Sequence, residues 1–138
     1  MGCYRRFRSI SFIFVLFLFS SQSFASEPHL SVVRDMAAFG PRVFGTESSI
    51  KAAEYIRNQF SMYGITNVKL QPVSGKRKGM NVVAMIPGKD TSRQIIIGSH
   101  HDSVPGSPGA YDDGGGTAVL LNVAKHFVSM QPPYTLVF

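Results

Sequence analysis

The order of the predicted elements indicates an α/β sandwich. Two segments with helical spacing of apolar residues come first, and two strand-like segments joined by a turn follow them. A short apolar strand over 94–99, an amphipathic helix and a second apolar strand over 134–138 complete the chain. A strand–helix–strand unit places its strands parallel across a right-handed crossover, so these two strands are expected to lie parallel in one sheet.

The first two elements are expected to be helices. The first spans Pro28 to Phe39 and ends at Gly40-Pro41, and the second begins after an N-cap at Ser48 or Ser49 and ends at Gly64. The predicted inward residues are Leu30, Val33, Met36, Ala37 and Phe39 in the first helix, and Ala52, Ala53, Ile56, Phe60 and Tyr63 in the second.

The strands and the last helix follow from the remaining pattern. Residues 66–73 alternate between apolar and polar, and the return strand over 80–86 follows a turn, which predicts a hairpin. The strand over 94–99 is continuously apolar, the pattern of a strand buried on both faces. A helix is predicted over 114–130. Its expected inward residues are Val119, Leu120, Val123, Ala124 and Phe127.

The N-terminus has the three parts of a secretory signal peptide. Arginines precede an apolar run over 10–19, and small residues lead to a cleavage site near Ala25-Ser26. We therefore predict a signal peptide over 1–25 and a mature chain over 26–138, secreted or periplasmic and not stably associated with a membrane after cleavage. An uncleaved N-terminal anchor is the alternative.

Composition excludes several classes of function. The single cysteine of the 138 residues lies in the predicted leader, so the mature chain has no disulfide, thiolate nucleophile or cysteine–zinc site. Three of the 14 basic residues also lie there, which leaves only a small excess over the 8 acidic ones. The dense basic cluster over 76–78 fits a solvated hairpin turn, so no nucleic-acid partner is expected.

The residues after the apolar strand suit a metal ion. In an extended segment, His100 and Asp102 share one face and His101 points to the other. A metal-bound imidazole commonly donates its second N–H to a carboxylate, which is the role predicted for Asp102. Asp112 and Asp113 follow a Pro- and Gly-rich loop, and one aspartate can bridge two cations. Alone, a pair such as His100 and Asp102 is also common as a surface hydrogen bond, and a pair such as Asp112 and Asp113 as a helix cap. Their combination at a strand end favours a metal site.

These residues resemble the metal motif of the M28 family of zinc peptidases, of the aminopeptidase Y and leucyl aminopeptidase type. The resemblance covers nearly all of 29–138 and implies a three-layer α/β sandwich of the zinc-exopeptidase kind, with a mixed, largely parallel central sheet. The matching segments are Gly98-Ser99-His100-His101-Asp102-Ser103, Pro108-Gly109-Ala110-Tyr111-Asp112-Asp113-Gly114-Gly115-Gly116, Gly40-Pro41-Arg42 with Gly45-Thr46, Ala52–Ile56 and Asn81–Ala84.

The resemblance also implies an activity. His100 would ligate one Zn²⁺, Asp112 would bridge two, and Asp102 would orient His100. Asp113 would follow Asp112 through a cis peptide bond. The reaction implied is hydrolysis, by a water that the two zinc ions activate, of peptides with a free N-terminus.

The family's later residues have no counterpart in this sequence. A Glu-Glu pair that supplies the general base and a zinc ligand, a further Asp ligand and a final His ligand are all absent. We therefore expect the chain to be a truncated, N-terminal part of such an enzyme, inactive alone. The alternatives are a non-catalytic exported binding domain and a glutaminyl-cyclase-like acyltransferase, although that branch typically has Asp-Ser in place of Asp112-Asp113.

Overall fold

The computed structural model describes residues 28–75 and 78–138, so the predicted leader lies outside the described residues. The elements are α1 (Pro28–Ala38), α2 (Glu47–Met62), β1 (Asn67–Val73), β2 (Gly79–Ile86), β3 (Asp90–Ile96), a kinked helical turn η1 (Ala110–Gly115), α3 (Gly116–Phe127) and β4 (Tyr134–Val137). Their order is the predicted one. In the described part of the chain, no helix has the length and apolar character needed to span a membrane.

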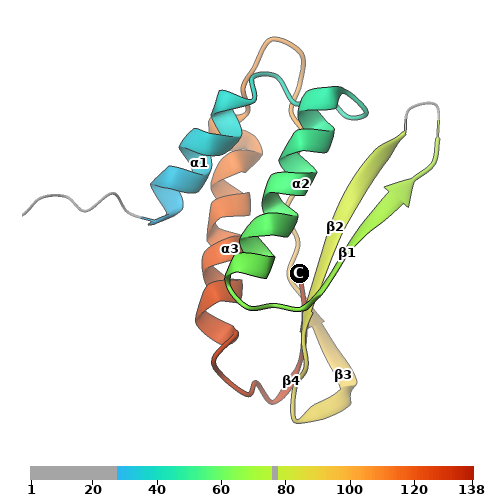
Figure 1. Cartoon of the computed structure of the whole chain (residues 1–138), viewed down its shortest axis with the longest axis vertical. Coiled ribbons are helices and arrows are strands. Elements are labelled where there is room, and N and C mark those ends of the chain that lie inside the picture. The colour runs from blue at the N-terminus through green and yellow to red at the C-terminus, as the bar shows by residue number, and fades with distance from the viewer. Residues whose placement is uncertain (1–27, 76–77) are drawn as a thin grey trace, which may run out of the picture.

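The four strands form one mixed sheet, in the order β1-β2-β4-β3 (Figure 1). The hairpin predicted from the alternating segments is confirmed, because β1 pairs with β2 antiparallel. β4 then pairs antiparallel with β2 and parallel with β3, which confirms the predicted parallel pair. The α/β class with a mixed sheet is therefore confirmed, and its parallel pairing in the described residues lies between β3 and β4.

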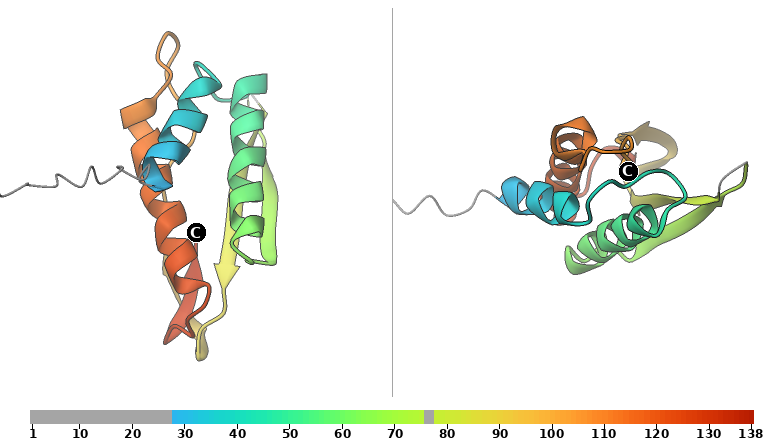
Figure 2. Two further views of the ribbon diagram at one scale, coloured as in Figure 1. Left: turned by 60° about the vertical axis from the view of Figure 1, so that its left-hand side comes forward. Right: turned by 90° about the horizontal axis from the view of Figure 1, so that it is seen from above.

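The three helices pack together on the same side of the sheet (Figure 2). α2 lies against β1 and β2, and α1 packs against α3 and η1. The core lies between the helices and the sheet. Its fully buried apolar side chains include Met36, Ala52, Phe60, Ala84 and Leu121. This part of the chain thus supplies the sheet and one helical layer of the expected sandwich.

The predicted cap of α2 is wrong by two or three residues. Thr46 is the N-cap, with extended backbone (φ −86°, ψ 163°), and its Oγ1 accepts a hydrogen bond from the Ser49 amide at 3.4 Å. Ser49 is 1% exposed inside the helix. The turn before α2 already presents a hydroxyl at Thr46, so the helix begins at Glu47 and the serines fall within its first turn.

The prediction that the apolar strand is buried on both faces is also wrong. β3 begins at Asp90 and ends at Ile96, and its side chains Ile95 and Ile96 are 45% and 77% exposed. The cause is the strand order: β4 lies between β2 and β3, so in the described residues β3 is an edge strand that pairs with β4 alone. Of this apolar run, Ile97 packs against the core.

The inward faces of two helices differ slightly from the prediction. Val119 is 60% exposed and Leu30 is 53% exposed, although both were expected inside. Leu121 and Val32 are buried near these positions, while Leu120 is buried as predicted. Both helices carry more apolar positions than one face can bury, and their packing on each other selects which of them turn inward.

Candidate metal centre

The predicted metal ligands come from two segments that meet beyond the end of β3. His100 lies four residues after β3, on the extended segment that leaves the strand. Asp112 lies in η1, directly before α3. The carboxyl end of a strand in an α/β sheet is the place where such proteins commonly hold functional groups.

The structure brings His100, Asp102 and Asp112 together. The His100 Nε2 atom lies 3.0 Å from Asp112 Oδ1. On the other side of the ring, Nδ1 lies 3.2 Å from the backbone oxygen of Asp102 and 3.4 Å from its carboxylate Oδ1. Both ring nitrogens of His100 therefore face acceptors.

The neighbours of His100 stabilise its positively charged form relative to a free imidazole. Burial lowers the pKa of His100, but the hydrogen bond to the Asp102 carbonyl and the negative charges of Asp102, Asp113 and Asp112 together raise it above its ordinary value. The same charges that attract a proton attract a metal ion. A cation at the Nε2 side of this ring is therefore electrostatically favoured.

The spacing of the two donor atoms suits zinc after a small adjustment. Tetrahedral coordination with bonds near 2.0–2.1 Å separates two donor atoms by about 3.4 Å, and Nε2 and Oδ1 are 3.0 Å apart. Both side chains can move, since His100 is 54% and Asp112 is 81% exposed. Within residues 28–75 and 78–138, no three His, Cys, Asp or Glu side chains gather around one point that could hold a metal ion. The described residues thus provide a pair of donors, fewer than the roughly three protein ligands of a catalytic zinc.

Asp113 has a different task from Asp112. The peptide bond between them is cis, as the family resemblance implies. The Asp113 carboxylate accepts hydrogen bonds from the Gly116 amide at 2.8 Å and from Ser99 Oγ at 3.0 Å. It therefore ties the start of α3 to the segment that carries His100, while Asp112 turns toward the imidazole.

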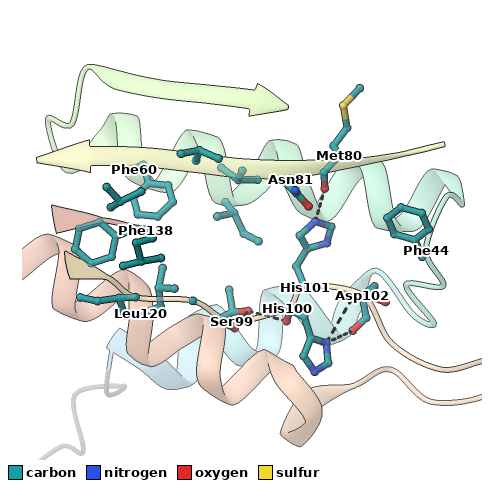
Figure 3. Close-up of a pocket in the computed structure, with 18 residues that line it drawn as sticks. Phe44, Phe60, Met80, Asn81, Ser99, His100, His101, Asp102, Leu120 and Phe138 are labelled. Carbon is teal, nitrogen blue, oxygen red and sulfur yellow. Dashed lines mark hydrogen bonds and ion pairs between the residues drawn. The ribbon is translucent and has the colours of Figure 1, made fainter. Parts of the chain in front are cut away.

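His101 points away from His100, into a cavity of about 310 Å³ between β2 and the segment after β3 (Figure 3). Its Nε2 lies 3.0 Å from the Met80 carbonyl, and its Nδ1 is buried with no hydrogen-bond partner among the described residues. Phe60 and Phe138 line the other end of this cavity. The alternation expected for an extended segment thus separates the two histidines.

Arg42 is the residue that sequence reasoning missed. The resemblance includes it only within Gly40-Pro41-Arg42, yet its side chain is fully buried and donates hydrogen bonds to backbone carbonyls of the loop between His100 and Asp112. An arginine directly after Gly-Pro, between two predicted helices, was the available signal. Nothing local in the sequence shows that its guanidinium is buried.

Comparison with known proteins gives a family for part of the chain. Residues 81–138 match the model of peptidase family M28. A protein of Arthroderma otae named probable leucine aminopeptidase is 27% identical over 112 residues, which cover 71% of this chain and 30% of that protein. The chain thus spans about a third of the length of such relatives.

Solved structures show the same fold. The crystal structure of LapB from Legionella pneumophila matches with a TM-score of 0.70 and 27% identity, over 80% of this chain and 33% of that one. Tannerella forsythia glutaminyl cyclase matches with a TM-score of 0.61 and 24% identity, over 80% and 45% of the two chains, and this match supports the fold alone. The sequence motif, the fold and these matches lead to one conclusion: over residues 81–138 the chain is similar to the peptidases of family M28.

Proposed function

We propose that this chain is part of a zinc-dependent exopeptidase that removes residues from the N-terminus of peptides. Residues 26–138 would form the N-terminal part of its catalytic domain. The observation that carries the proposal is the arrangement around His100, whose Nε2 lies 3.0 Å from Asp112 Oδ1 while Asp102 lies behind Nδ1. The relationship to aminopeptidases supports the reaction class.

Each of the three residues has a distinct role in this proposal. His100 Nδ1 donates to the backbone carbonyl of Asp102 at 3.2 Å and faces its carboxylate at 3.4 Å, which leaves the Nε2 lone pair directed toward the metal position. Asp112 faces that position with Oδ1, and its second oxygen can reach another cation because the side chain is largely exposed. Zinc, when bound, supplies a Lewis acid that polarises a peptide carbonyl and activates water.

The general base and further ligands of such an enzyme would lie outside residues 1–138. The 138-residue polypeptide by itself is therefore expected to bind zinc weakly and to hydrolyse an aminoacyl-nitroanilide little or not at all, because loss of a general base alone typically costs about 10²–10⁴-fold in rate. Zinc-dependent turnover by a monomer of this polypeptide would contradict this assignment of ligands.

Metal binding tests the site directly. Co²⁺ added to the purified chain should give a visible absorption band, and the variants His100→Gln and Asp112→Asn should each weaken binding by about ten-fold or more, because each removes one of two donors. The control is His126→Gln, which removes an exposed histidine of α3 whose ring meets Phe127 edge to face. Equal Co²⁺ affinity in all four proteins would refute the metal site and favour a binding domain without catalysis.

A longer gene product that includes residues after Phe138 distinguishes the candidate reactions. Release of nitroaniline from an aminoacyl-nitroanilide, abolished by Asp112→Asn, is the expected result. Cyclisation of an N-terminal glutamine peptide without aminopeptidase activity would instead support a glutaminyl-cyclase-like acyltransferase.

We further propose that the protein is exported. The proposal depends on the arginines, the apolar run and the small residues of 1–25, which predict cleavage near Ala25-Ser26. N-terminal sequencing of secreted or periplasmic material should begin near Ser26. Intact Met1 in a soluble cytoplasmic fraction would remove this proposal.

A further inference from the structure

Arg42 is a fully buried cation, 0% exposed, in the connection between α1 and α2. No ion pair shorter than 4 Å joins it to a carboxylate in the described residues. A buried charge with no carboxylate at ion-pair distance needs hydrogen-bond acceptors around it. The positions of those acceptors show which segments of the chain the Arg42 side chain connects.

The guanidinium donates to four backbone carbonyls. Nε donates to His101 O at 2.7 Å, Nη2 donates to Gly109 O at 3.0 Å, and Nη1 donates to Met36 O at 2.8 Å and also to Pro108 O. His101 and Gly109 stand at the two ends of the loop that separates the candidate ligands. Met36 lies in the last turn of α1, where the helix dipole favours a cation, and its carbonyl also accepts from the Phe39 amide at 3.3 Å.

The backbone of Arg42 adds a second attachment. Its amide donates to Ser103 Oγ at 2.8 Å, and its carbonyl accepts from the Ser103 amide at 3.0 Å. Ser103 Oγ in turn donates to the Ser107 carbonyl at 2.9 Å. Residues 101–109 are thereby closed around the arginine.

These attachments reach both sides of the candidate metal centre. His101 directly follows His100, so the bond from Nε fixes the backbone next to the imidazole. The carbonyl of Gly109, three residues before Asp112, also accepts from the Gly114 amide at 3.0 Å. One side chain therefore sets the separation of the two segments that carry His100 and Asp112.

We propose that Arg42 is a positioning residue of the metal centre, which holds the His100 and Asp112 segments at ligand spacing through the loop carbonyls. The proposal rests on the zinc function above. A lysine cannot replace the arginine, because one ammonium group at the end of a flexible chain does not reach carbonyls on three sides in the way that a planar guanidinium does.

The test compares Arg42→Lys with a core variant that lowers stability without touching the loop. Phe60→Leu is that control, since Phe60 lies in α2 and its ring packs on Phe138. Two measurements are made on metal-free protein: the nuclear Overhauser contact between the His100 ring and the Asp112 side chain, and hydrogen exchange of the Ser103 and Gly114 amides. A third measurement is Co²⁺ affinity.

Arg42→Lys should lose the His100–Asp112 contact and the protection of both amides, and its Co²⁺ affinity should fall by about ten-fold or more, the range seen when residues that orient ligands are removed. Phe60→Leu should keep all three properties. If Arg42→Lys does not fold, Ser103→Ala decides: it removes the hydroxyl on which the Arg42 amide rests and should weaken the same contact.

The proposal is overturned if Arg42→Lys, or Ser103→Ala in its place, keeps the contact and the Co²⁺ affinity of Phe60→Leu. If the parent chain binds no Co²⁺, the zinc function fails instead, and the two metal-free measurements alone decide the role of Arg42.

Discussion

Replacing Gly109 by alanine measures how tightly the loop packs on the buried guanidinium. Gly109 has a positive φ of 57°, and a Cβ built on it would lie 2.6 Å from Ser103 Cβ, 2.8 Å from Asp112 O and 2.9 Å from Arg42 Nη2. None of these three neighbours moves easily, because Asp112 O is backbone and the Arg42 side chain is held by four carbonyls.

The expected loss of stability has two parts. A left-handed backbone costs an alanine about 1–2 kcal/mol relative to glycine. Forcing a methyl group into packed surroundings costs about 1–3 kcal/mol more. Gly109→Ala should therefore lower the free energy of unfolding by about 2–5 kcal/mol. The change falls at the start of η1, so it should also displace Asp112 from His100.

Gly106→Ala is the matched control. Gly106 also has a positive φ, 81°, but a Cβ there would have no neighbour within 4 Å, so only the backbone part of the cost applies. Urea unfolding followed by circular dichroism gives the free energy of unfolding for both variants and for the parent chain. Equal destabilisation by Gly109→Ala and Gly106→Ala would refute the claim that the loop is packed closely around Arg42.

Three further predictions concern single side chains. Thr46→Ala should lower the free energy of unfolding by about 1 kcal/mol because it removes the N-cap of α2, and Thr46→Ser should restore it, as measured by urea unfolding. Burial and the hydrogen bond to Asp35 raise the pKa of Tyr55. The contribution of the protonated phenol to the free energy of unfolding should therefore be complete below about pH 10. It should be lost as the pH rises toward the pKa of Tyr55 in the folded protein. Tyr55→Phe should reduce this alkaline loss in pH-dependent thermal unfolding, whereas Tyr111→Phe, at a 95% exposed position, should leave it unchanged. Gly116→Ala should displace the Asp113 carboxylate, which lies 2.2 Å from the position of the added Cβ, and so shift the Ser99 and Gly116 resonances; unchanged resonances would contradict the close contact.

Local pattern was enough to predict the order of the elements and the motif of the candidate site. Apolar periodicity depends on neighbours a few residues apart, so the helices, the hairpin and the strand–helix–strand unit could be recognised from the chain alone. The opposite directions of His100 and His101 likewise follow from the alternation of an extended segment. The leader and the metal ligand roles remain predictions.

Strand order and helix packing determined which of the predicted side chains are buried. An apolar run such as Ile95–Ile97 indicates burial, but β3 lies at an edge because β4 enters between it and β2, a pairing of segments some 40 residues apart. Arg42 is the clearest case. As a lone arginine in a turn it indicates a surface residue, and it becomes a buried support for the candidate site only because Met36, His101 and Gly109 present carbonyls to it from three separate places in the chain. A cation is stable inside a protein only where acceptors surround it, and the fold alone determines where those acceptors meet.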